Sequence, residues 1–190
     1  MLRCAPVGHT ACVRSRFLIL LVVAGAVLAA SGSRLGAAPD TSTTTVVLVR
    51  HAEKDTHFVG ADQPLNAAGV LRAEELARVL GDVSFSAIFT TPWSRSRKTA
   101  EPLARHQGDS LTVVDAIDRT VQGIRQHAGG TVLVVGHSNT IPQIIAALTG
   151  RSELESLAVR YDDLFVLTLV HDHPPRLLRL HYGAPSSFAR

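Results

Sequence analysis

The chain has 190 residues, of which 46% are hydrophobic and 18% charged, enough for one globular domain and a short extension. Its formal net charge of +3 is produced by four arginines within the first 38 residues, a stretch that contains no acid. The remainder is close to neutral, with 15 basic and 16 acidic residues. This balance argues against a general polyanion-binding surface, and therefore against nucleic acid as a partner.

The beginning of the chain has the pattern of an export signal. A basic stretch precedes "FLILLVVAGAVLAA", a run of 14 apolar residues, and small residues follow in "SGSRLGAAPD". A membrane-spanning helix needs roughly 18–20 apolar residues, so cleavage is favoured over permanent anchoring. We expect residues 1–38 to be an export signal with the start of a linker, and residues 39–43 to complete the linker. The protein would then be periplasmic or secreted, and membrane-anchored only if the signal is not cleaved.

Thiol chemistry is excluded from the mature domain. The two cysteines, Cys4 and Cys12, both lie in the expected signal. Without them the domain has no disulfide, no catalytic thiol and no thiolate metal site. The sequence also offers no carboxylate and histidine cluster at metal-ligand spacing around the candidate site, so we expect neither a metal nor an organic cofactor.

After the linker, apolar runs alternate with segments of helical periodicity. The runs "TVVLV", "FSAIFT", "LTVVDAI" and "TVLVVGH" predict strands, and "LNAAGVLRAEELARVLGD", "SRSRKTAEPLARHQG", "DRTVQGIRQHAGG" and "NTIPQIIAALTG" predict helices. This alternation favours right-handed βαβ units, whereas the closing "RYDDLFVLTLV" and "RLLRLHYG" predict a hairpin. We expect residues 44–190 to form one three-layer α/β/α domain. Its sheet would be mostly parallel, with helices on both faces and a C-terminal antiparallel hairpin.

Cationic and hydrogen-bonding residues follow three of the predicted strands. Arg50 and His51 follow the first strand, Arg95 follows the second, and His137 with Asn139 follows the fourth. Ligands of open α/β sheets bind beyond the carboxyl ends of the strands, so these side chains should converge. Free N–H groups at the starts of the next helices also attract anions. Phosphate fits this set best, because arginine matches its oxygens in pairs.

The expected nucleophile at this site is a histidine. The chain has neither the "GxSxG" pattern of serine hydrolases nor the "GxxxxGK" loop of nucleotide-binding enzymes. Histidine is a competent covalent nucleophile, and nearby arginines disfavour a further positive charge on its ring. The same arginines would hold a phosphoryl group in line and stabilise its developing charge.

Four motifs in this order resemble the histidine phosphatase superfamily, which has the phosphoglycerate-mutase-like fold. "LVRHAEK" is similar to its "RHG/RHA" signature, and "DQPLNAAGVLRAEELARVL" to its following helix. "TTPWSRSRKTAEPLA" is similar to its arginine segment, and "VVGHSNTIPQII" to its second-histidine motif. Together with the signal, the motifs make the chain resemble a small exported bacterial-type member. Ser96 and Lys98 depart from the usual alanine and glutamine, and Trp93 either shapes the mouth of the pocket or packs.

The resemblance implies a metal-independent phosphatase that hydrolyses a phosphomonoester through a phosphohistidine. His51 aligns with the phosphorylated nucleophile, and Arg50, Arg95 and His137 align with residues that bind the phosphoryl group. No cofactor is implied. The partner would be a small phosphorylated substrate or a phosphoprotein.

The general acid and one phosphate contact stay open. Asp115 and Asp118 follow the third strand, where Asp118 is better placed by pattern but could instead cap the next helix. Glu53, beside the nucleophile, is the other candidate acid. Asn139 either touches phosphate or caps its helix.

Two other functions are compatible with the same motifs. A compact domain without an evident acid also resembles the small protein phosphohistidine phosphatases, whose leaving group is a nitrogen. A non-catalytic module that binds phosphorylated ligands on this fold is the second alternative. The chain retains all four residues of the expected phosphate site, namely Arg50, His51, Arg95 and His137. This argues against the non-catalytic module.

Overall fold

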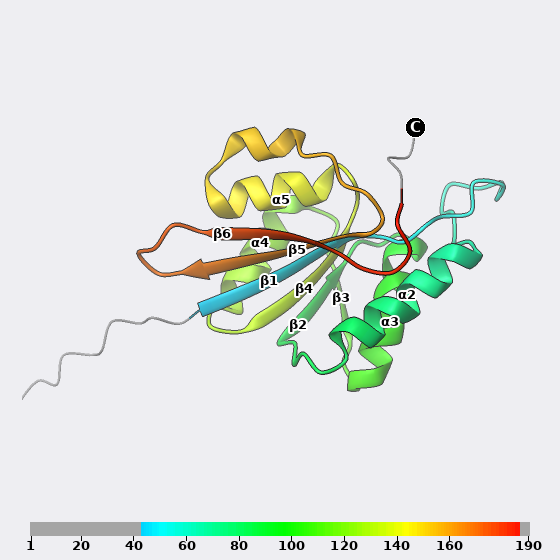
Figure 1. Cartoon of the computed structure of the whole chain (residues 1–190), viewed down its shortest axis with the longest axis horizontal. Helices are drawn as coiled ribbons and strands as arrows, with labels where there is room; N and C mark the ends of the chain where they lie inside the picture. Colours follow the sequence, from blue (N-terminus) through cyan, green and yellow to red (C-terminus); the bar gives the residue numbers. More distant parts are fainter. Residues whose placement is uncertain (1–42, 187–190) are drawn as a thin grey trace, which may run out of the picture. The chain divides into compact units, whose positions relative to one another are not determined.

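The computed structural model describes residues 43–186, which form a six-stranded sheet with helices packed against it (Figure 1). Within these residues, no helix has the length and apolar character needed to cross a membrane. The elements, in chain order, are β1 (Thr43–Arg50), α2 (Ala67–Leu80), β2 (Ala87–Thr90), α3 (Ser94–Gln107), β3 (Leu111–Val113), α4 (Ile117–Gln126), β4 (Thr131–Gly136), α5 (Thr140–Thr149), the 3₁₀ helix η1 (Ser152–Ser156), β5 (Asp163–Val170) and β6 (Arg176–His181).

The strand order is β3-β2-β4-β1-β5-β6. The first four strands of this order run parallel, and β5 pairs antiparallel with both β1 and β6. The prediction of a mostly parallel sheet with a C-terminal antiparallel hairpin is confirmed. Its consequence for function is that β1 and β4 are neighbours and end together, with Arg50 opposite Gly136.

Two apolar cores, one on each face of the sheet, account for the uninterrupted apolar run of β1. Val46 and Leu48 belong to the core that α4 and α5 cover, whereas Val47 and Val49 belong to the core under α2 and α3. A strand that is buried on both faces has no polar alternation, as is typical of parallel sheets under two helix layers. The three-layer arrangement expected from the sequence is confirmed.

The turn before α2 is fixed by close contact between backbone segments. The side chain of Asn66 caps α2 by accepting a hydrogen bond from Gly69 N over 2.9 Å, and Asn66 N donates to Glu53 O over 3.0 Å. A Cβ on Gly69 would overlap the Glu53 carbonyl oxygen. Only glycine therefore lets α2 approach the segment that follows β1.

Several boundaries differ from the predicted ones. β3 stops at Val113, before the rest of "LTVVDAI", and α4 begins at Ile117 with Asp118 in its first turn. β5 begins at Asp163, because Arg160 N donates to the Asp163 carboxylate over 2.6 Å and closes a turn there. The short helix η1 was not predicted. The export signal and most of the linker lie outside the described residues.

Candidate active site

The site lies where β1 and β4 end side by side. His51 follows Arg50 directly, and its backbone N–H donates to the Gly136 carbonyl over 2.8 Å. His137 follows Gly136, so the parallel register brings the two histidines together. Their ring centroids are 5.1 Å apart in an edge-on arrangement. The sequence-based prediction that these two strand ends converge therefore holds in the structure.

Two hydrogen bonds orient the His51 ring. Its Nδ1 lies 2.8 Å from the carbonyl oxygen of Ala52, an acceptor, so Nδ1 carries the proton and donates. Its Nε2 is then the atom with the free lone pair, and it accepts from Nε of Arg95 over 3.3 Å. The ring thus presents an unprotonated nitrogen to the arginine that would hold a phosphate.

Both histidines are held in the neutral form. Burial lowers the pKa of His51 to about 3; the hydrogen bond to Ala52 acts against this shift, while His137, Arg95 and Arg50 add to it. Burial also lowers the pKa of His137 to about 4, with further lowering by the same two arginines. From the sequence we attributed the neutral state of His51 to nearby arginines, whereas burial is the main cause of its lowered pKa.

The Arg50 guanidinium is held from one side by the segment that precedes β5. Its Nη1 donates to the Val159 carbonyl over 3.1 Å, and its guanidinium carbon lies 3.8 Å from the centre of the Tyr161 ring. Among the described residues, none accepts a hydrogen bond from the buried Nε of Arg50. Burial lowers the pKa of Arg50, with Tyr161 and Glu53 acting against the shift. A buried arginine with an unused donor is suited to an oxyanion.

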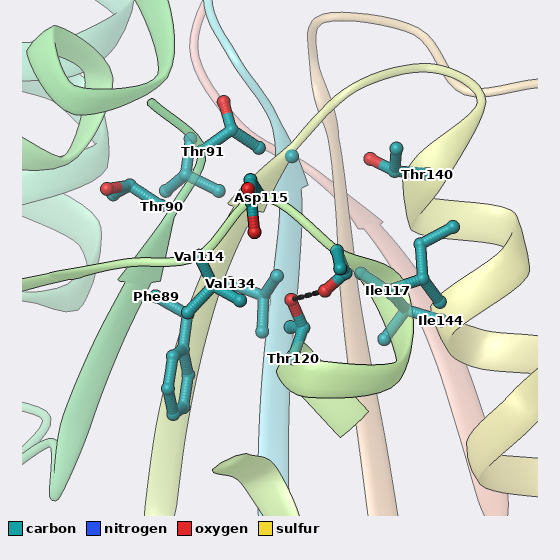
Figure 2. A pocket seen from close by; sticks show the side chains of 13 residues that line it. Phe89, Thr90, Thr91, Val114, Asp115, Ile117, Thr120, Val134, Thr140 and Ile144 are labelled. Atoms are coloured by element: carbon teal, nitrogen blue, oxygen red, sulfur yellow. Dashed lines mark hydrogen bonds between the residues drawn. The ribbon is translucent and has the colours of Figure 1, made fainter. Parts of the chain in front are cut away.

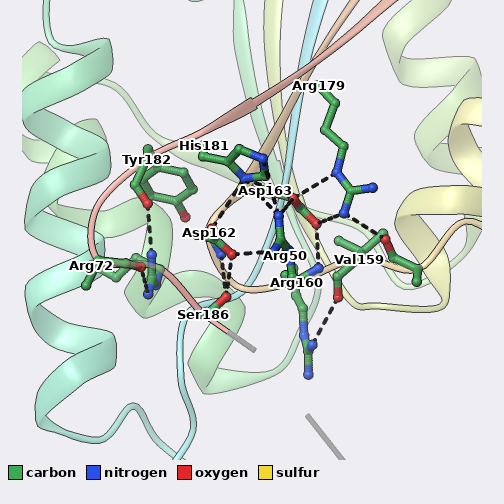
Figure 3. Close-up of polar contacts among 12 residues, drawn as sticks. Arg50, Arg72, Val159, Arg160, Asp162, Asp163, Arg179, His181, Tyr182 and Ser186 are labelled. Carbon is green, nitrogen blue, oxygen red and sulfur yellow. Dashed lines mark hydrogen bonds and ion pairs between the residues drawn. The ribbon is translucent and has the colours of Figure 1, made fainter. Parts of the chain in front are cut away.

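Asp163 holds that supporting segment in place (Figure 3). Its carboxylate is fully buried and accepts from Nε and Nη2 of Arg179 over 2.9 and 2.7 Å, as well as from the backbone of Arg160. The turn from Arg160 to Asp163 carries Tyr161 against both Arg50 and His51, whose ring lies 5.9 Å away. Sequence reasoning missed Tyr161, although it stands in the "YDDLF" motif.

Hydroxyl groups of the arginine segment "TTPWSRSRKTAEPLA" connect α3 to the segments that carry the two histidines. Thr99 Oγ1 accepts from Ala52 N over 2.9 Å and donates to the Arg95 carbonyl over 2.7 Å. Thr91 Oγ1 lies 3.1 Å from Nε2 of His137 and 2.8 Å from Oγ of the buried Ser96. These contacts explain why serine is accommodated at position 96, and they show that Thr91 and Thr99 orient the site.

The two candidate acids occupy different places. Glu53 is paired with Arg72, which donates from Nε and Nη2 over 2.7–3.0 Å, and Arg72 also binds the carbonyls of Tyr182 and Ala184. Asp118 is exposed in the first turn of α4. Glu53 is thus held in an ion pair and Asp118 faces solvent. In the described structure neither carboxylate forms a hydrogen bond with His51.

Asp115 lines a cleft that is also lined by Thr91, the residue in contact with His137. The cleft has about 340 Å³ of empty space and is lined by Thr91, Gly136 and Thr140 together with an apolar floor around Phe89. Figure 2 shows the Asp115 side chain among these residues. Thr91 lines this cleft and also contacts His137, whereas the Asp115 side chain is 63% exposed and lies 3.5 Å from Arg119.

Asn139 does not cap α5 through its side chain. No capping hydrogen bond from it is found in the described structure, and its backbone is already helical. Thr140 Oγ1 instead accepts from His137 N over 2.8 Å, in the turn that precedes α5. The capping alternative for Asn139 is therefore not formed, and its contact with phosphate stays a prediction.

One group within residues 43–186 has the composition of a metal site, namely Asp162, Asp163 and His181. Its two carboxylates already accept from Arg179 and from the hydroxyl of Ser186. The group therefore forms an ion-pair network that supports the turn next to Arg50. His51 and His137 are not part of it.

Comparison with known proteins agrees with this geometry. The model of the histidine phosphatase superfamily (branch 1) matches residues 46–118. A Bacillus subtilis (strain 168) protein described as the uncharacterized phosphatase PhoE is 40% identical over 63 residues, which are 30% of this chain and 33% of that protein. The chain thus matches about a third of the length of this curated relative.

Two solved structures share the fold. The alpha-ribazole phosphatase from Shigella flexneri has a TM-score of 0.61 at 17% identity, over 72% of this chain and 96% of that one. The protein histidine phosphatase SixA, in complex with tungstate, has a TM-score of 0.60 at 16% identity, over 72% and 96% of the respective chains. The family-model match over residues 46–118, the four motifs in order and the shared fold make this chain similar to the histidine phosphatase superfamily.

Proposed function

We propose that the protein is a phosphatase that hydrolyses phosphomonoesters through a phosphohistidine on His51, without a metal. The observation that carries this proposal is the state of the His51 ring. Nδ1 donates to Ala52 O, Nε2 is unprotonated and beside Arg95, and burial keeps the ring neutral. An imidazole in this state can attack phosphorus without prior loss of a proton.

The bond changes follow from this arrangement. The lone pair on Nε2 of His51 forms the N–P bond while the P–O bond to the leaving group breaks. Arg50 and Arg95 would bind the phosphoryl oxygens, and His137 would contact the same group from β4. The leaving oxygen takes up a proton, which we assign to the Asp115 carboxyl group in the adjoining cleft. Water then attacks phosphorus, phosphate leaves, and the N–P bond returns its electrons to Nε2.

The test is to trap the intermediate. Radiolabelled phosphate from a phosphomonoester should become attached to His51 and survive alkaline denaturation, as expected of a phosphohistidine. His51→Ala should abolish labelling and turnover, whereas EDTA should change neither. Turnover retained in His51→Ala, or turnover lost on chelation, would contradict the proposal. Binding of phosphate without any turnover across a broad ester panel would favour the non-catalytic module instead.

A second candidate function is hydrolysis of protein phosphohistidine. What favours it is that, in the described part of the chain, no carboxylate is hydrogen-bonded to either histidine. A nitrogen leaving group needs less help from an acid than an alkoxide does. The fold is also shared with a protein histidine phosphatase. Rates on a phosphohistidine-containing protein and on an alkyl phosphate, compared in the same preparation, decide between the two.

Export to the periplasm or the exterior is a further part of the proposal. It is supported by the basic and apolar pattern of residues 1–38. Sequencing the N-terminus of protein recovered outside the cytoplasm tests it, and an intact Met1 in soluble cytoplasmic protein would overturn it.

A further inference from the structure

Trp93 lies at the edge of the phosphate site and remains 40% exposed. It directly precedes α3, the helix that carries Arg95. The Arg95 guanidinium carbon lies 4.7 Å from the centre of its ring, a cation–π contact that fixes the indole beside the arginine. One residue therefore touches the phosphate-binding guanidinium and also offers open aromatic surface.

A second apolar element is fastened to the same helix start. The loop between Lys54 and Leu65 is closed at its base by a bridge between these two residues and by the Asp55 N to Pro64 O hydrogen bond of 2.8 Å. Farther out, the Asp62 carboxylate accepts from Ser94 N over 2.8 Å, which ties the loop to the residue after Trp93.

Two large apolar side chains are exposed on this loop. Phe58 is 45% exposed and Val59 is 98% exposed. A Cβ added to Gly60 would lie only 2.6 Å from the Phe58 ring. The loop therefore folds tightly around this ring. Because Asp62 ties this loop to Ser94, the residue after Trp93, its exposed apolar side chains belong to the segment next to the start of α3, and adjoining exposed apolar groups mark ligand-binding surfaces.

We propose that Trp93, with Phe58 as its outer part, forms an apolar rim that binds the leaving group and selects phosphomonoesters with a flat aromatic or apolar group. This inference rests on the proposed phosphatase function. Arg95 holds the phosphoryl group and the indole together, so a ring linked to the phosphate by a short spacer would lie over Trp93. Offset or edge-on aromatic contact would then add to the binding free energy that the phosphate supplies.

Binding can be read directly, because Trp93 is the chain's single tryptophan. Benzylphosphonate and ethylphosphonate place the same head group in the site, but only the first carries a ring to the rim. We expect benzylphosphonate to change the tryptophan emission and to bind about tenfold more tightly than ethylphosphonate. Equal affinities with no emission change would overturn the inference. Failure of both to bind would instead contradict the proposed function.

Kinetics provide the second test. The alcohols released from 2-phenylethyl phosphate and ethyl phosphate have similar acidity, so the ratio of their kcat/KM values reports rim contacts and not chemical reactivity. We expect Trp93→Ala to lower this ratio about tenfold and Trp93→Phe to keep most of it. Phe58→Ser should lower it less, without touching the Arg95 contact.

A matched control removes exposed apolar surface elsewhere. Leu178 lies on β6 and is 59% exposed, so Leu178→Ser should leave the ratio and both rates unchanged. An unchanged ratio in both Trp93→Ala and Phe58→Ser, with the wild-type fold confirmed by circular dichroism, would overturn the inference. If the wild-type protein hydrolyses neither ester, the result contradicts the proposed function and not the apolar rim.

Discussion

Nε of Arg95 donates to Nε2 of His51 over 3.3 Å, so the proposed attacking atom and the guanidinium proposed to bind phosphate are already in contact. Lysine could supply a charge at position 95 but not the planar, two-point geometry of a guanidinium. We expect Arg95→Lys to lower kcat/KM by about 10²-fold, the usual loss when a donor aimed at developing charge is removed. Steady-state kinetics on one ester measure this loss.

The control for this change lies two residues along the same helix. Arg97 is exposed, and no contact joins it to either histidine in the described structure. Arg97→Lys should therefore keep wild-type kinetics. Equal losses in the two variants would mean that guanidinium groups on α3 matter in general, and not the specific contact between Arg95 and His51.

The lowered histidine pKa values predict how stability depends on pH. In the unfolded chain His51 titrates near 6.5, and in the folded protein near 3. Between these values the unfolded state binds more protons, so the free energy of unfolding falls as pH falls. We expect His51→Asn to be relatively more stable than wild type at pH 5 than at pH 7, by about 1–2 kcal/mol. Urea unfolding at the two pH values tests this; a parallel loss in both proteins would contradict the assignment.

Asp115 and Asp118 make different predictions about leaving groups. Asp115 and Asp118 are both exposed, but only Asp115, which lies 3.5 Å from Arg119, lines the cleft next to Thr91. If Asp115 supplies the proton, Asp115→Asn should slow hydrolysis of an alkyl phosphate about 10²-fold and leave 4-nitrophenyl phosphate nearly unaffected, because its leaving group needs no proton. Asp118→Asn is the matched control and should affect neither ester. The reverse result would assign the acid to Asp118.

Parallel strands with clear apolar runs and motifs at their ends were predictable, and so was the meeting of Arg50, His51, Arg95 and His137. Local pattern places each of these residues at the end of a strand, and the rule that ligands bind beyond the carboxyl ends of parallel strands brings the ends together. Tyr161, Val159 and Thr91 could not be placed in this way, because they reach the site through contacts between segments distant in sequence. For Asn139 the sequence left phosphate contact and helix capping open, and the described structure shows no capping hydrogen bond from its side chain.

The ion pair between Glu53 and Arg72 predicts a structural role for Glu53. Arg72 is 5% exposed and Glu53 18% exposed, and two backbone carbonyls near the C-terminal end also depend on Arg72. Arg72→Met would leave the carboxylate without its partner, so we expect a loss of about 3 kcal/mol in the free energy of unfolding. Arg78→Met, which breaks the exposed pair with Glu75, should change stability little.

The same pair separates anchoring from acid catalysis at Glu53. If Glu53 anchors α2, Glu53→Gln should lower the melting temperature and reduce the rates on alkyl and 4-nitrophenyl phosphate by the same factor. A loss confined to the alkyl ester, at an unchanged melting temperature, would mark Glu53 as the acid instead.

The buried carboxylate of Asp163 should fix the position of the Arg50 guanidinium without touching it. It closes the turn that places Val159 and Tyr161 against this guanidinium, and in the described structure it makes no contact with His51 or His137. Asp163→Asn keeps the shape of the side chain but weakens the hold on Arg179 and on the turn. Because Arg50 would then be less well positioned for the anion, we expect the inhibition constant of inorganic phosphate and KM to rise about fivefold to tenfold, with a smaller change in kcat.

Two variants of Tyr161 test the same contact. Tyr161→Leu should raise both constants in the same way, and Tyr161→Phe should keep the wild-type values. Arg151→Met, which breaks an exposed pair with Glu153, serves as the control. A fall in kcat at constant phosphate affinity would show that Asp163 acts on the fold as a whole and not through Arg50.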